Sequence, residues 1–194
     1  METSQKSIKG NVVEAARGIF TRFGFKKTTM DEIAQSCHMG KSTLYYYFKS
    51  KEEIFKAVVE KESKALKRGI ERAVDQQKTP QKKLHAYVIT RMHALNRLSN
   101  FHSVLKDKYL KRYTFIEKIR KRHLKDELET MKGILKEGIE RENFIINNLD
   151  LTSSTFIIAL RGLEYPWAIE NGMLNAGEKV DNLLGILFNG IVKK

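Results

Sequence analysis

Cysteine, proline and tryptophan are almost absent from this chain of 194 residues. Cys37 is the only cysteine, so a disulfide within one chain is impossible. The only prolines are Pro80 and Pro166, and most of the remaining sequence is compatible with long helices. These scarcities favour an all-α fold.

Long hydrophobic runs are also missing. No apolar stretch approaches the ~20 residues that a membrane-spanning helix needs. The first 20 residues are amphipathic and lack the apolar core of a signal peptide. We therefore expect a cytoplasmic protein that makes no membrane contact.

No arrangement of catalytic or metal-binding residues stands out. Most of the histidines are scattered, without the spacing or acidic neighbours of a metal site; they are His85, His93, His102 and His123. Residues 40–43, Gly-Lys-Ser-Thr, imitate the end of a nucleotide-binding loop, but Gln35 stands where that motif has its first glycine. We expect no enzymatic activity, no catalytic residue, no metal and no cofactor.

Positive charge is what the sequence has in excess, with a formal net charge of +13. Basic residues outnumber acidic ones by eight to four in residues 1–50, and by 19 to five in residues 61–125. The densest part is residues 106–125. A basic protein of this size suggests a polyanionic partner. A solvated helix face is the simplest explanation for residues 106–125, and steering onto DNA or attraction of an anionic ligand such as an acyl-coenzyme A are the alternatives.

The N-terminal part predicts three helices in close succession. Apolar residues recur every three or four positions from Ile8 to Phe23, and Gly24 should end that helix. Thr29 and Glu32 fit a capping box that opens a helix of barely two turns. A turn follows, in which His38 should take a positive φ. The third helix should run over residues 41–48, so the pattern predicts a helix-turn-helix.

The third helix carries the run Lys-Ser-Thr-Leu-Tyr-Tyr-Tyr-Phe. Leu44 and Phe48 lie four residues apart and should anchor one face to the core. The other side chains of this helix should face the major groove of DNA. For Tyr45, packing against the protein is an equal alternative. Lys51, in the first turn of the next helix, should hold a phosphate together with the free N–H groups of that helix end.

Residues 8–59 resemble the DNA-binding domain of the TetR/AcrR family of bacterial transcriptional regulators. The likeness runs without gaps through GIFTRFGFKKTTMDEIAQSCHMGKSTLYYYFKSKEEIF. It implies a helix-turn-helix domain over residues 1–50, and a helical ligand-binding and dimerisation domain over residues 51–194. The candidate DNA-binding residues are then Thr29, Lys41, Ser42, Thr43, Tyr45, Tyr46, Tyr47 and Lys51.

The second domain offers candidates for a ligand pocket and a dimer interface. Pro166 should kink or interrupt its helix and so open a cavity in a helical bundle. The tentative pocket consists of aromatic and apolar residues near Pro166 or elsewhere in this domain: Tyr109, Tyr113, Phe156, Leu160, Tyr165 and Trp167. The apolar stripe of the last helix is the candidate dimerisation surface: Val180, Leu183, Leu184, Leu187, Phe188 and Ile191.

The sequence is best interpreted as a ligand-responsive DNA-binding regulator, most simply a repressor that binds a palindromic operator in double-stranded DNA as a homodimer. Its ligand would be a small apolar molecule, with or without an acidic head group. A first alternative is a DNA-binding protein that is controlled by a protein partner and has no small-molecule inducer. A second is a helical enzyme on the same fold, which the missing catalytic residues disfavour.

Overall fold

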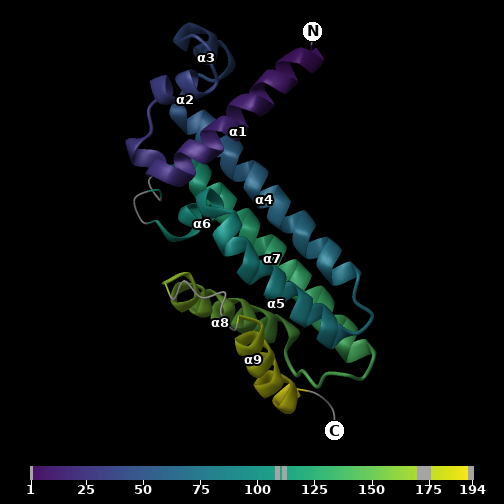
Figure 1. The fold of residues 1–194 in the computed structure, drawn as a ribbon. Helices are drawn as coiled ribbons and strands as arrows, with labels where there is room; N and C mark the ends of the chain where they lie inside the picture. Colours follow the sequence, from purple (N-terminus) through teal and green to yellow (C-terminus); the bar gives the residue numbers. More distant parts are fainter. Residues whose placement is uncertain (1, 108–109, 111–112, 170–175, 192–194) are drawn as a thin grey trace. The chain divides into compact units, whose positions relative to one another are not determined.

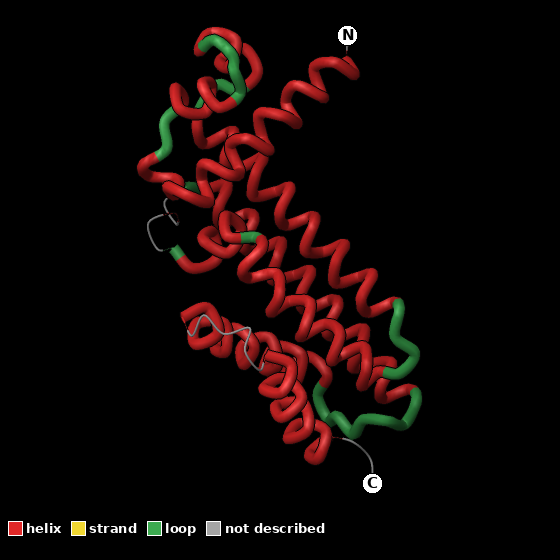
Figure 2. Tube along the Cα trace, viewed as in Figure 1, coloured by secondary structure: helices red, strands yellow, loops and turns green. Residues whose placement is uncertain are grey.

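The computed structural model describes residues 2–107, 110, 113–169 and 176–191 (Figure 1). Within these residues the chain is built from helices and the loops that join them, with no extended strand (Figure 2). The helices are α1 Glu2–Lys27, α2 Met30–Ser36, α3 Lys41–Tyr47, α4 Lys51–Asp75, α5 Pro80–Arg97, α6 Ser99–Lys106, α7 Thr114–Glu140, α8 Leu149–Ile169 and α9 Ala176–Ile191. The predicted all-α fold is confirmed. None of the helices in these ranges is long and apolar enough to cross a membrane.

Several helix boundaries follow from the local sequence. Pro80 begins α5, where its missing N–H and fixed φ are tolerated, and the Lys82 amide donates to Thr79 Oγ1 at 3.3 Å. At the start of α8, the Leu151 amide donates to Asn148 Oδ1 at 2.9 Å. Helix α8 continues through Pro166 without interruption.

Gly24 does not end α1 as predicted but bends it. Its φ of 76° and ψ of 162° are not helical, and one further turn reaches Lys27. A positive φ costs glycine little because it has no Cβ. The Thr28 hydroxyl donates to the Gly24 carbonyl at 2.8 Å and so satisfies a group that the bend frees from the helix.

The chain forms two compact units. The head unit contains residues 1–64 and 98–120, and the bundle unit contains residues 65–97 and 121–194. Helix α6 thus belongs with α1 to α3, although it is distant from them in sequence. The division falls within α4 and within α7. The predicted functional boundary after residue 50 concerns DNA binding and stays a prediction.

The head unit is held together by an aromatic core. The ring centroids of Phe20 and Phe55 are 5.0 Å apart, and those of Phe25 and Phe55 are 4.7 Å apart. Tyr113 packs edge-on against Phe25 at 5.4 Å. Such pairs add about 0.5–1.5 kcal/mol beyond their buried area. The core therefore ties α1 to α4 and to the residue that precedes α7.

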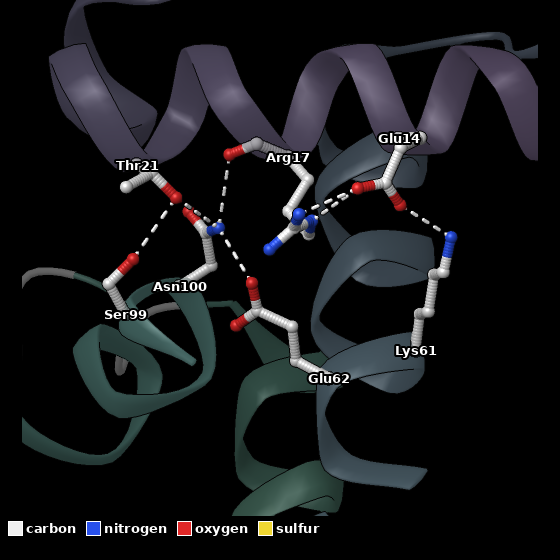
Figure 3. Close-up of polar contacts among 7 residues, drawn as sticks. All are labelled: Glu14, Arg17, Thr21, Lys61, Glu62, Ser99 and Asn100. Carbon is white, nitrogen blue, oxygen red and sulfur yellow. Dashed lines mark hydrogen bonds and ion pairs between the residues drawn. The ribbon is translucent and has the colours of Figure 1, made fainter. Parts of the chain in front are cut away.

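A buried polar cluster joins α1, α4 and α6 in the same unit (Figure 3). Asn100 Nδ2 donates to Glu62 Oε1 at 2.9 Å, to Thr21 Oγ1 at 2.9 Å and to the Arg17 carbonyl at 3.2 Å. Glu62 Oε2 accepts from the Phe101 amide at 2.7 Å, in the first turn of α6. Burial raises the pKa of Glu62, and the hydrogen bonds from Asn100 and Phe101 oppose that rise.

The bundle unit has an apolar core crossed by one group of buried charges. Glu127 on α7 is 4% exposed and Arg91 on α5 is 3% exposed. Arg91 contacts Glu127 Oε1 at 2.6 Å, and Arg161 on α8 contacts Glu127 Oε2 at 2.7 Å. His123, one turn before Glu127, lies 3.4 Å from Oε1. A single carboxylate thus links three helices.

Candidate nucleic-acid interface

The first part of the candidate interface is α2, and its start is fixed by a complete capping box. The Glu32 amide donates to Thr29 Oγ1 at 3.2 Å, and the Thr29 amide donates to Glu32 Oε2 at 2.7 Å. The Thr29 hydroxyl also donates to Glu32 Oε2 at 2.9 Å. Ile33 and Ala34 are the buried residues of this helix. The predicted cap is confirmed, and it orients a helix too short to be stable alone.

The turn between α2 and α3 has the predicted backbone. His38 has a φ of 51°, and the Met39 amide donates to the Ala34 carbonyl at 3.1 Å, which closes the C-terminus of α2. Gly40 is the N-cap of α3 and, having no side chain, makes no side-chain cap bond. Helix α3 therefore starts from backbone geometry alone.

Helix α3 has one buried and one exposed face. Leu44 is 0% exposed and Phe48, its C-cap, is 4% exposed, as predicted for the anchoring pair. Lys41, Ser42 and Thr43 are exposed. Of the tyrosines, Tyr46 is the most exposed at 63% and Tyr45 is at 38%, while Tyr47 is half-buried and meets Tyr46 edge-on at 5.1 Å. The polar and aromatic side chains of α3 are thus presented together to solvent.

Lys41 is held by an acidic partner from α2. Its Nζ lies 2.8 Å from Asp31 Oδ1 and donates to Oδ2 at 3.0 Å. The hydrogen bond and charge of Asp31 raise the pKa of Lys41. Both side chains are about 60% exposed, so the pair adds little stability. Its effect is to orient the Lys41 ammonium beside the first turn of α3.

Lys51 is bound to the protein itself. Its Nζ donates to the Thr28 carbonyl at 2.7 Å and lies 4.7 Å from the centroid of the Phe25 ring. The cap at the start of α4 differs from a simple capping box. The Glu53 amide donates to Ser50 Oγ at 3.2 Å, but the Glu53 carboxylate accepts from the Lys49 amide at 2.7 Å. Lys51 therefore joins the start of α4 to the segment between α1 and α2, and its phosphate contact stays a prediction.

The candidate ligand and dimer residues are dispersed. Phe156 and Leu160 are buried in α8, whereas Tyr113 packs in the head unit. Val180 and Leu184 are each 2% exposed in the isolated chain, and Leu183 and Phe188 are half-buried. Tyr109 and the side chains of four other candidates lie outside the described residues: Tyr165, Trp167, Leu187 and Ile191.

Sequence reasoning missed two residues that shape this surface. Asp31 on α2 orients Lys41, which its position in the sequence does not indicate. Lys49, whose Nζ donates to the Tyr45 carbonyl at 3.3 Å, is an exposed cation beside the end of α3. The ten-residue spacing of Asp31 and Lys41 carries no signal by itself, because it depends on the angle between α2 and α3.

Removing the α2 cap should weaken the fold. We expect Thr29→Ala to lower the free energy of unfolding by about 1 kcal/mol, because the Glu32 amide would lose its partner. The measurement is urea unfolding at one fixed protein concentration. Thr43→Ala is the control, since Thr43 is exposed on α3 and its hydroxyl makes no hydrogen bond within the described ranges. Equal effects of the two substitutions would show that the cap is unimportant.

Comparison with known proteins extends these observations. Residues 12–58 match the model of the family described as bacterial regulatory proteins, tetR family. The HTH-type regulator YhgD of Bacillus subtilis is 41% identical over 64 residues, which are 33% of this chain and 34% of YhgD. The icaADBC biofilm operon negative regulator IcaR of Staphylococcus epidermidis is 36% identical over 53 residues, 27% of this chain and 29% of IcaR. The match therefore spans only about a third of these relatives.

Two solved structures are similar over nearly the whole chain. A transcriptional regulator from Cytophaga hutchinsonii has 25% identity and a TM-score of 0.75, covering 94% of this chain and 97% of that one. FadR of Bacillus subtilis, solved with stearoyl-CoA, has a TM-score of 0.75 over 93% of this chain and 98% of its own, at 19% identity. The second likeness shows the fold alone.

The helix-turn-helix geometry and these likenesses define the class of residues 12–58: they form a DNA-binding domain of the kind found in bacterial transcriptional regulators. Within these residues the chain matches the tetR family.

Proposed function

We propose that the protein is a ligand-responsive repressor that binds a palindromic operator as a homodimer in the cytoplasm. The observation that carries the proposal is the exposed face of α3, which gathers a cation, two hydroxyl groups and tyrosines opposite the buried Leu44 and Phe48. A helix that presents such a face fits the major groove of DNA.

The two sides of α3 should have different tasks. Lys41 and Ser42 stand in its first turn, the part that approaches the base edges when a recognition helix enters the groove. Tyr46 offers a ring for thymine methyl groups and a hydroxyl for phosphate. Tyr47 and Lys51 should contact the backbone, for which Lys51 would exchange its bond to the Thr28 carbonyl for one to a phosphate.

Repression and a small ligand are supported by similarity. IcaR is described as a negative regulator, and the FadR structure contains stearoyl-CoA. An apolar ligand with an anionic head would also suit the basic residues 106–125. The alternative is control by a protein partner. Operator release by acyl thioesters, tested with purified protein, would favour the small ligand.

A second copy of the chain would cover apolar side chains on α8 and α9. Ile158 is 69% exposed, Leu151 is 63% exposed and Ile186 is 66% exposed. Isologous pairing of these two helices would give a four-helix contact about a twofold axis. A palindromic operator then mirrors the symmetry of the dimer.

Substitutions on α3 should separate base reading from backbone binding. Tyr46→Ala and Lys41→Ala should each narrow the affinity gap between operator and scrambled DNA by roughly 1–3 kcal/mol. Lys51→Ala should weaken binding to both DNAs alike and lower the slope of log K against log salt by about 0.9. The operator is first selected from random DNA, and each variant is then titrated on both DNAs at several salt concentrations.

Lys64→Ala is the matched control, because Lys64 is exposed on α4 and does not belong to the candidate interface. It should leave both affinities unchanged. Circular dichroism must show that Lys51→Ala remains folded. If Lys51→Ala alone erased the preference for operator while the two α3 variants were neutral, the assignment of these residues would be wrong.

A further inference from the structure

The head unit contains a cavity of about 190 Å³ beside the bend in α1. Gly24 and residues of α6 both line it. All lining residues belong to the head unit, so this cavity is distinct from any pocket among α5, α8 and α9. Phe20, Phe25 and Leu110 supply apolar walls. The rest of the lining is Gly24, the polar residues Thr21, Ser99, Asn100 and Ser103, and the charged residues Lys26 and Asp107.

The cavity has room for a small ring. An apolar cavity of about 150 Å³ in another protein binds benzene. The apolar walls here are firm, because Phe20 is 2% exposed and Leu110 is 2% exposed, and Phe25 is packed against Phe55. The volume is therefore sufficient for a six-membered ring with one or two substituents.

Asn100 gives the cavity a directional polar group. The residue is only 3% exposed. Its Nδ2 faces a carbonyl, a carboxylate and a hydroxyl, and a carbonyl or carboxylate can only accept. The amide orientation is thereby fixed. Asn100 Oδ1 is an acceptor that receives no hydrogen bond from the described part of the chain, and such a group gains from a donor.

We propose that this cavity is a binding site for a small phenol-like molecule, an aromatic ring that carries a hydroxyl donor. The ring lies against Phe20, Phe25 and Leu110, and the hydroxyl donates to Asn100 Oδ1. Aromatic rings pack favourably edge-on or offset against phenylalanine, which favours a flat ring over a branched aliphatic body.

The position of the cavity lets a bound ligand act on the DNA-binding helices. Gly24 bends α1 just before α2 begins, and Asn100 ties α6 to α1 through Thr21 and the Arg17 carbonyl. A ligand wedged between them should alter the angle of this bend. This regulatory consequence rests on the proposed function, whereas the binding site does not.

The test uses the full chain and phenol as the probe, with toluene as the ring that lacks the donor. Saturation-transfer NMR should show saturable phenol binding at concentrations that leave the circular dichroism spectrum unchanged. Toluene should bind about 2- to 10-fold more weakly, the range expected for one lost hydrogen bond. Operator affinity, measured separately, should fall when phenol saturates the site.

Ser103→Leu should fill the cavity and abolish phenol binding. Ser36→Leu is the matched control, because both hydroxyls donate to the carbonyl three residues earlier, at 2.7 Å for Ser103 and 2.8 Å for Ser36, and Ser36 does not line the cavity. The Ser36→Leu variant should bind phenol as the unsubstituted protein does.

Three results would each overturn the site: absence of saturable phenol binding, equal binding of toluene, or unchanged phenol binding by Ser103→Leu. Phenol binding that leaves operator affinity unchanged would overturn only its regulatory role, and none of these results depends on whether the protein represses.

Discussion

Replacing Glu127 by alanine is expected to lower the free energy of unfolding by about 3–5 kcal/mol, because it would leave Arg91 charged and buried without its carboxylate. The loss of stability should be large because Glu127 also contacts Arg161 and His123. One substitution thus removes the ion pairs that link α5, α7 and α8. Urea unfolding followed by circular dichroism, at fixed protein concentration, measures the effect.

Glu129→Ala is the control for this experiment. Glu129 lies on the same helix, but its side chain is 62% exposed, and its one ion pair among the described residues is a 3.7 Å contact to Lys125. An exposed pair of this kind contributes at most about 0.5 kcal/mol. If the two substitutions had similar effects, the buried charges would not be a stabilising link between the helices.

The same group of charges should make the free energy of unfolding depend on pH in the acidic range. Burial by itself raises the pKa of Glu127, but the hydrogen bond from His123 and the charge of Arg91 outweigh it and lower the pKa from 4.5 to about 2. The stabilisation is therefore complete above pH 4.5 and is lost as the pH falls toward 2. It amounts to about 3 kcal/mol. Glu127→Gln should lack this part of the pH dependence, whereas Glu129→Gln should keep it.

The head unit was the part that the sequence predicted best, because its signals are local. The capping box of Thr29 and Glu32, the positive φ of His38 and the anchoring pair Leu44 and Phe48 involve residues at most four apart. Propensity, capping and spacing decide such features, and each pointed to the same helix-turn-helix. Gly24 was the exception, because its conformation bends α1 and the residues after it form another turn.

The buried polar groups could not be predicted in the same way. Glu62 and Asn100 are 38 residues apart, and Arg91 and Glu127 are 36 apart. Each of these residues lies in a helix with many polar residues. The sequence does not distinguish the polar residues that become buried from those that stay exposed. Only the packing of α6 on α1 and α4, and of α7 on α5, decides which of them is enclosed. The cavity beside Gly24 has no signal in the sequence for the same reason, since α1 and α6 come together only in the fold.

Ile158→Glu is expected to dissociate the proposed homodimer. The Ile158 side chain is 69% exposed in a single subunit. A twofold axis would place two copies of this side chain in the interface. Burying an isoleucine contributes about 2 kcal/mol, so losing two should weaken dimerisation roughly a thousandfold, and the two introduced carboxylates would repel each other as well. Operator affinity should fall with it, because one head alone reads only half of a palindrome. Sedimentation and operator titration at the same protein concentrations measure the two effects.

Ile145→Glu is the matched control for the dimer. Ile145 is 60% exposed, and it lies in the loop between α7 and α8 rather than on the proposed contact surface. It introduces the same charge at a similar exposure, so a general effect of charge or solubility would appear in both variants. Only Ile158→Glu should yield monomers. A dimer that survives Ile158→Glu, or equal dissociation of both variants, would mean that α8 does not form the subunit contact.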